Sequence, residues 1–150
     1  EALTDNRNRT ASEVRASFTK HGGNLGETGS VNFMFDRVGL IEYVNTVATE
    51  DEMFEAALEA GAENVEFASV GHEVICNPDS FNQVRESLEM RFGAAQSARL
   101  EWFPQTTLSL DEDSARTLLK MIGILEDNDD VQSVHANFEI SDQVLQKLNV

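Results

Sequence analysis

The chain has 150 residues, 41% of them hydrophobic, and a formal net charge of −16. This length suits one domain or two small ones, and the hydrophobic content supports a folded core rather than disorder. The acidic charge argues against general affinity for nucleic acid, and no apolar run approaches the roughly 20 residues of a membrane span. The single cysteine excludes a disulfide framework and fits a reducing compartment, so we expect a cytoplasmic protein.

Residues 1–37 are predicted to form the end of a strand, a helix and a second strand. Thr10 and Glu13 have the spacing of a capping box, and hydrophobic residues at helical spacing follow until Gly22-Gly23, which should end the helix. Residues 31–36 alternate between apolar and other side chains, as in a strand. The chain begins without Met, and we expect it to be a fragment of a longer protein with its first strand truncated.

Residues 38–103 predict the order strand, helix, strand, strand, helix, strand. A capping box at Thr49 begins the first of these helices, and Asn77-Pro78 begins the second. This order is the ferredoxin-like split unit. The predicted hairpin turns around Gly71.

Residues 104–150 predict strand, helix and strand again, with Asp111 as the helix cap. Together with residues 1–37 they supply one more unit of the same order, in which residues 38–103 are inserted at the middle hairpin. The predicted fold is therefore α+β, with two nested ferredoxin-like (βαββαβ) domains whose antiparallel sheets carry helices on one face. The tail 141–150 is expected to be a docking helix or disordered.

Charge is distributed unevenly along the chain. Residues 1–37 carry five acidic and five basic side chains, whereas residues 38–103 carry a net charge of −10. Arginines beside asparagines at the start of the first helix suit an anion, although a turn stabilised by Asx hydrogen bonds is an equal alternative. The glycine-rich corner at 20–26 could approach a phosphate closely, but a helix end followed by a loop is the better reading.

No catalytic or metal site is predicted. The three histidines lack metal-ligand spacing, and Cys76 has no patterned partner. The acidic run Asp127–Asp130 resembles a cation loop only weakly, and a solvated loop is favoured. We therefore expect a protein that is not an enzyme and has no cofactor.

Four stretches resemble the YebC/PmpR family in the family's order: Leu3–Arg37, Met53–Phe67, Phe103–Leu110 and Ile124–Ile140. The resemblance implies a basic helical domain upstream, absent here, and a discontinuous second domain that hosts the third as an insertion. Members of the family are described as DNA-binding transcriptional regulators. Others are described as translation factors that relieve stalling on the ribosome, and a mitochondrial relative activates translation of a cytochrome oxidase subunit.

The resemblance also implies which residues face nucleic acid or a neighbouring domain. These are Asn6, Arg7, Asn8, Arg9, Thr10, Arg15, Lys20, Gly22, Gly23, Asn24 and Gly26. The expected partners are DNA or ribosomal RNA, mainly through the absent basic domain, and ribosomal proteins through the acidic insert, with no membrane. A probable DNA-binding transcriptional regulator is the first interpretation. A ribosome-associated translation factor and a small-molecule-sensing module are the alternatives.

Overall fold

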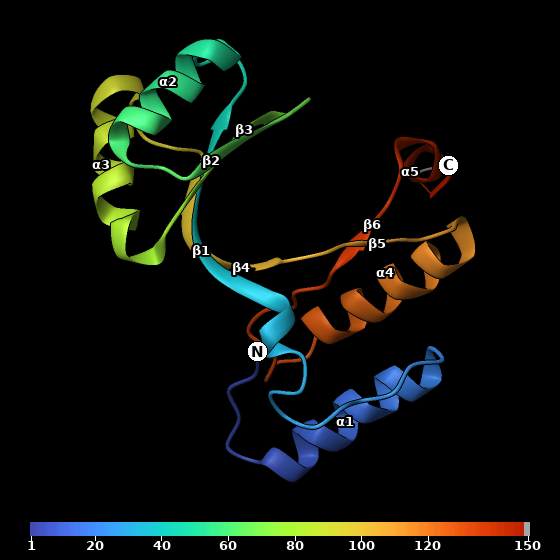
Figure 1. Cartoon of the computed structure of the whole chain (residues 1–150). Helices are drawn as coiled ribbons and strands as arrows, with labels where there is room; N and C mark the ends of the chain where they lie inside the picture. The colour runs from blue at the N-terminus through green and yellow to red at the C-terminus, as the bar shows by residue number, and fades with distance from the viewer. Residues whose placement is uncertain (149–150) are drawn as a thin grey trace. The chain divides into compact units, whose positions relative to one another are not determined.

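The computed structural model describes residues 1–148, which form two compact units (Figure 1). Unit 1 comprises residues 1–34 and 104–148, and unit 2 comprises residues 35–103. Strand β1 runs without a break from Phe35 to Val44, so the two units divide before Phe35, whereas the sequence placed the division after Arg37. The α+β class predicted from the sequence is confirmed.

Unit 2 contains all six elements that the sequence predicts for it. They are β1 (Phe35–Val44), α2 (Glu50–Ala60), β2 (Asn64–Ala68), β3 (Gly71–Cys76), α3 (Phe81–Phe92) and β4 (Ser97–Pro104), with a 3-10 turn (Pro78–Ser80) before α3. The strand order in the sheet is β2-β3-β1-β4, and β3 pairs antiparallel with both β1 and β2. Helices α2 and α3 cover one face of this sheet (Figure 1).

The core of unit 2 forms where the two helices meet the sheet. Met53 from α2 and Val84 and Leu88 from α3 pack against Ile41 and Val74 of the sheet, and all five side chains are at most 1% exposed. The predicted capping box at the start of α2 is present, with the Thr49 side chain accepting from the backbone N–H of Glu52 and the Glu52 side chain accepting from that of Thr49. The local capping signal and the packing of the core thus favour the same helix in this unit.

Unit 1 has two helices that are longer than those of unit 2, a short third helix, and shorter strands. Its elements are α1 (Arg7–Lys20), a 3-10 turn (Asn32–Met34), β5 (Leu108–Ser109), α4 (Glu112–Glu126), β6 (Phe138–Glu139) and α5 (Asp142–Leu148). Strands β5 and β6 form a two-stranded sheet and pair in parallel, whereas the sequence predicted an antiparallel sheet for this unit. The two strands are joined by α4, and a helical crossover places the strands that it joins in the same direction. Ala2 adds an isolated antiparallel bridge to Val131.

Two local predictions in unit 1 were wrong, and a third, for the tail, left a helix and disorder open. Thr10 does not cap α1, because the helix already begins at Arg7 with Asn6 as its cap. The strand predicted at 31–36 is a 3-10 turn up to Met34, and only the residues from Phe35 onward enter a strand. The tail forms a helix up to Leu148, and its last two residues lie outside the described residues. Within residues 1–148, no helix is long and apolar enough to cross a bilayer.

Candidate functional site

The first turn of α1 uses the asparagine of the predicted anion loop as a structural residue. The side-chain oxygen of Asn6 accepts a hydrogen bond from the backbone N–H of Arg9 at 3.1 Å, which satisfies one of the unpaired donors at the helix start. The backbone N–H of Asn6 in turn donates to the hydroxyl of Thr4 at 3.0 Å. The Asx interpretation of this loop therefore describes Asn6 correctly.

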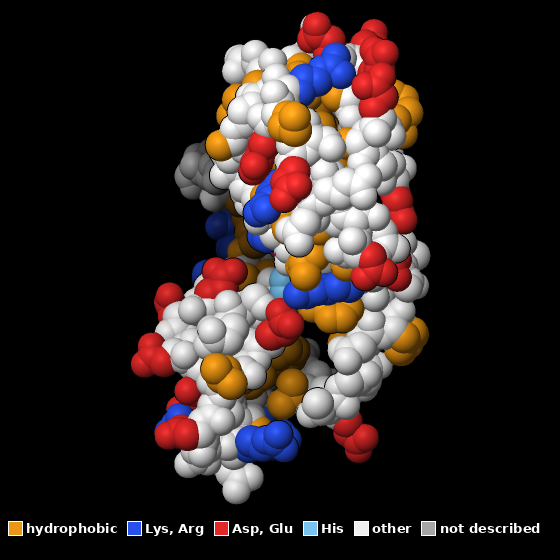
Figure 2. Space-filling view, turned by 90° about the vertical axis from the view of Figure 1, so that its left-hand side faces the viewer, with side chains coloured by type: hydrophobic (Ala, Val, Ile, Leu, Met, Phe, Trp, Pro, Cys, Tyr) orange, Lys and Arg blue, Asp and Glu red, His pale blue; other side chains and the backbone are white. Residues whose placement is uncertain are grey.

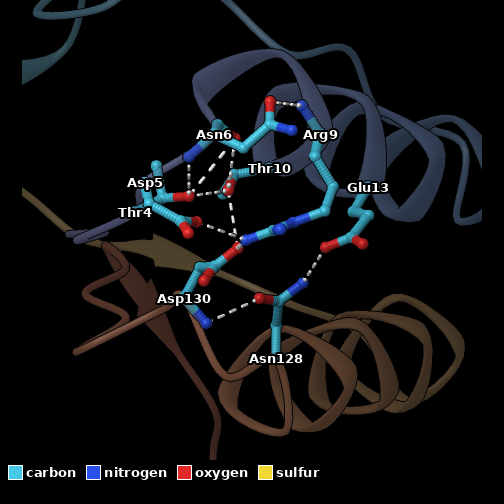
Figure 3. A network of polar contacts seen from close by, with 8 residues as sticks. All are labelled: Thr4, Asp5, Asn6, Arg9, Thr10, Glu13, Asn128 and Asp130. Atoms are coloured by element: carbon cyan, nitrogen blue, oxygen red, sulfur yellow. Dashed lines mark hydrogen bonds and ion pairs between the residues drawn. The ribbon is translucent and has the colours of Figure 1, made fainter.

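Arg9 and Thr10 both bind Asp130, which lies in the loop between α4 and β6 (Figure 3). Thr10 is 5% exposed, and its hydroxyl donates to Oδ2 of Asp130 at 2.7 Å, because a carboxylate can only accept. The guanidinium of Arg9 lies 3.0 Å from the same oxygen and 3.1 Å from Asp5. The backbone N–H of Leu3 donates to the Asp130 carbonyl at 2.8 Å, so this Asp130 network joins the start of the chain to the end of α4.

The Asp130 network changes the charge available to a ligand. The hydroxyl of Thr10 and the guanidinium of Arg9 lower the pKa of the Asp130 carboxyl, and the pKa of Arg9 is raised by its hydrogen bond to Asp130. A shallow hollow of about 470 Å³ next to these groups is lined by Arg9, Glu13, Asp127, Asn128, Asp129 and Asp130. Its surplus of carboxylates makes this end of α1 a poor receptor for phosphate.

Sequence reasoning missed three members of this arrangement, which are Thr4, Asn128 and Asp130. Asn128 donates to the Glu13 carboxylate at 2.8 Å, and its side-chain oxygen accepts from the backbone N–H of Asp130 at 2.9 Å (Figure 3). The acidic run at 127–130 was recognised in the sequence but interpreted as solvated. Nothing in the sequence pairs it with a loop more than 100 residues away, so only the tertiary structure reveals the contact.

The other end of α1 is closed by the glycines of the predicted corner. The backbone N–H of Gly23 donates to Phe18 O at 2.8 Å and that of Gly22 donates to Thr19 O at 3.2 Å, which is the Schellman arrangement. Gly22 has a φ of +80°, a left-handed conformation that other residues rarely adopt. The helix-end interpretation therefore accounts for both glycines, while Gly26 packs close to Ser30 in the loop that follows.

Two hollows lie along the seam between α1 and α4, and we refer to them together as the α1–α4 groove. They have volumes of about 560 and 620 Å³ and share His21 and Thr117. The first is lined by Phe18, His21, Gly22, Gly23, Asn24, Asp113, Ser114, Thr117, Leu118 and Met121. The second is lined by Lys20, His21, Thr117, Lys120, Gly123, Ile124 and Asp127. The groove thus combines predicted site residues with α4 residues that the sequence did not indicate.

The second hollow is the more cationic part of the groove. Lys20 and Lys120 both line it, with Asp127 as its only acidic residue. Among the described residues, neither lysine forms an ion pair, whereas Arg9 forms two. His21 places Nδ1 2.6 Å from Ser17 O, so this nitrogen donates to the carbonyl. The hollow therefore offers two ammonium groups to an anion, whereas the Thr117 hydroxyl already donates to the Asp113 carbonyl at 3.0 Å.

The remaining predicted cations do not share one face of α1. Successive helical residues are rotated by about 100°, so Arg7 and Arg15 are roughly 80° apart, while Lys20 is roughly 140° from Arg15. All three side chains are exposed, as is Asn8. A single flat surface can therefore contact the Arg7–Arg15 side or the Lys20 side of the helix, but not both.

Comparison with known proteins identifies the family. The family model described as the second and third domain of TACO1/YebC matches residues 1–138, and the chain belongs to this family. A crystal structure of a conserved hypothetical protein, Aq1575 from Aquifex aeolicus, is similar, with a TM-score of 0.83 and 44% sequence identity. The similarity covers 97% of this chain and 60% of that chain. The resemblance to YebC/PmpR proteins stated from the sequence is confirmed.

Proposed function

We propose that this chain is part of a regulator of gene expression that binds nucleic acid, as a DNA-binding transcriptional regulator, and that it binds rather than catalyses. Membership of a regulator-like family supports the general statement. The α1–α4 groove supports a contact with phosphates, since it brings together Lys20 and Lys120, which have no ion pair among the described residues. These lysines carry the proposal, because the Asp130 network already engages Arg9.

Charge separation between the two units is consistent with this assignment. Unit 1 carries 13 acidic and 7 basic residues, and unit 2 carries 14 acidic and 4 basic residues. A phosphate backbone is repelled by unit 2 and is tolerated only where cations gather locally. We therefore assign contact with nucleic acid to unit 1.

The test compares a Lys20→Ala/Lys120→Ala variant with a Lys147→Ala control in the protein as expressed from its own gene. Lys147 is an exposed lysine of the same unit, on α5, and lies outside the groove. Affinity for duplex DNA is measured across a salt series. Loss of two phosphate contacts should reduce the slope of log K against log salt by about 1.8. An unchanged slope in the groove variant, or the same change in the control, would contradict the assignment.

A ribosome-associated translation factor that relieves stalling or activates translation is the second candidate, and the acidity of unit 2 favours it. A net charge of −10 on one small domain suits the basic proteins of a ribosome better than it suits DNA. Co-sedimentation with ribosomes that is lost in the groove variant, without a sequence-selective shift of DNA, would select this function. A sequence-selective shift lost in the same variant would select transcriptional regulation.

A further inference from the structure

Helix α2 of unit 2 exposes a pair of hydrophobic side chains on its outer side. Its inner side is occupied by Met53 and three alanines, Ala56, Ala57 and Ala60, all of which are buried. Phe54 and Leu58 are one turn apart and remain 44% and 49% exposed. Residues four apart on a helix are neighbours on its surface, so the two side chains form one continuous apolar strip.

An acidic stripe runs beside this strip. Asp51, Glu55 and Glu59 follow one another at intervals of four residues, and at about 100° per residue they lie next to Phe54 and Leu58 on the solvent side. Glu59 lies 3.7 Å from Arg91 of α3, whereas Asp51 and Glu55 have no ion-pair partner in the part of the chain that the structure describes. The helix itself contains no basic residue.

Folding does not explain this stripe. Acidic residues in the first turn, such as Asp51, are favoured by the helix dipole, but Glu59 is in the last turn, where a negative charge is unfavourable. Like charges four residues apart also destabilise a helix, by about 0.2–0.5 kcal/mol per pair. The stripe therefore weakens α2 as an isolated element, and an external cationic partner would relieve that repulsion.

We propose that this face of α2, formed by Asp51, Phe54, Glu55, Leu58 and Glu59, binds a basic polypeptide segment that carries an apolar anchor. The strip supplies the apolar contact, and the stripe pairs with lysine or arginine side chains. The face extends over nine residues, a rise of about 12 Å, which matches two turns of a partner helix. The net charge of −10 on unit 2 excludes nucleic acid as the occupant.

The surface of unit 2 carries both acidic and hydrophobic side chains. Figure 2, in which the helical side of unit 2 forms the upper part of the view, shows Asp and Glu side chains next to hydrophobic ones. Met90 on α3 is exposed as well, at 89%, but it stands beside the basic Arg91 and has no hydrophobic neighbour one turn away on the helix. Met90 thus provides a matched control for the strip.

The probe is a synthetic 18-residue peptide of lysine and leucine with one apolar face, together with a scrambled peptide of the same composition. Binding to the 150-residue chain is followed by two-dimensional NMR of labelled protein and by titration calorimetry at two salt concentrations. We expect shift changes confined to α2 and its neighbours for the patterned peptide. The scrambled peptide should bind more weakly, because its apolar groups cannot face the strip together.

Three variants separate the contribution of the apolar strip to binding from that of the acidic stripe. Phe54→Ser/Leu58→Ser should weaken binding about tenfold, because half of each side chain is already buried and only the rest is gained on binding. Met90→Ser should leave the affinity unchanged. Asp51→Asn/Glu55→Gln should weaken binding and reduce its salt dependence. Circular dichroism checks that each variant retains the helix content of the wild type.

Several results would overturn the proposal. Shift changes spread over all acidic surfaces, with equal affinity for both peptides, would mean unspecific charge attraction. Equal effects of the Phe54→Ser/Leu58→Ser and Met90→Ser variants would remove the role of the strip. Sedimentation that shows a dimer, lost only in the strip variant, would make α2 an interface between copies of this chain. None of these results bears on the function proposed for the α1–α4 groove, because its lysines are unchanged in all three variants.

Discussion

Replacing Thr10 by valine tests whether the Asp130 network holds the start of unit 1 together. Valine has nearly the same shape, but it cannot donate the 2.7 Å hydrogen bond to the Asp130 carboxylate. A hydrogen bond to a charged acceptor contributes about 1.5–3 kcal/mol, and the lower end applies because Arg9 continues to hold Asp130. A loss of about 1.5 kcal/mol corresponds to roughly tenfold more frequent local opening.

Hydrogen exchange of backbone amides measures this opening directly. The Leu3 amide, which donates to the Asp130 carbonyl, and the Thr10 amide, which donates to Asn6 O, should exchange about ten times faster in the Thr10→Val variant. Amides of unit 2 should be unaffected, and Thr10→Ser, which retains the hydroxyl, should be close to wild type. If the valine and serine variants exchange at the same rate, the hydroxyl does not stabilise the network and the reasoning fails.

Three further predictions concern acid, a glycine and the cysteine. The Thr10 hydroxyl and the Arg9 guanidinium lower the pKa of Asp130 in the folded state, so the network stabilises the fold above the unfolded pKa and its contribution disappears as the pH falls. The protection of the Leu3 amide, which compares its exchange rate with that of an unstructured peptide at the same pH, should therefore decrease below about pH 4. A Cβ at Gly71 would overlap the carbonyl oxygen of Tyr43, so Gly71→Ala should cost about 2 kcal/mol in urea unfolding of unit 2, and an unchanged midpoint would refute the overlap. Burial raises the pKa of Cys76, so mass spectrometry should detect alkylation by iodoacetamide only in urea, and rapid alkylation of the folded protein would contradict the buried position.

The sequence predicted unit 2 well because its signals are local. Thr49 and Glu52 are three residues apart, and Gly61 takes up the left-handed conformation that ends α2, so both helix limits can be read from adjacent residues. The four strands of this unit are five to ten residues long, which is enough for an alternation of apolar and polar residues to show. Local and tertiary preferences therefore point to the same structure.

Unit 1 was predicted less well because long-range contacts override its local patterns. Thr10 has the sequence context of a helix cap, but Asn6 caps the helix earlier and releases the Thr10 hydroxyl to bind Asp130. Residues 31–36 alternate like a strand, yet the structure forms a 3-10 turn there before β1 begins. The strands β5 and β6 have only two residues each, so their pairing depends on α4 between them rather than on alternation.

The structure also shifts the proposed anion contact from the start of α1 to its C-terminal end. The sequence suggested an anion beside the arginines at the start of α1, and for Arg9 the carboxylate of Asp130 in the same unit takes that place. Arg116 and Lys147 are likewise engaged, each with Glu112. Among the described bases of unit 1, Arg7, Arg15, Lys20 and Lys120 are left without an ion pair. The last two line the same hollow, which is why the proposed contact with phosphate is placed at the C-terminal end of α1, where the Lys120 ammonium offsets the unfavourable helix dipole.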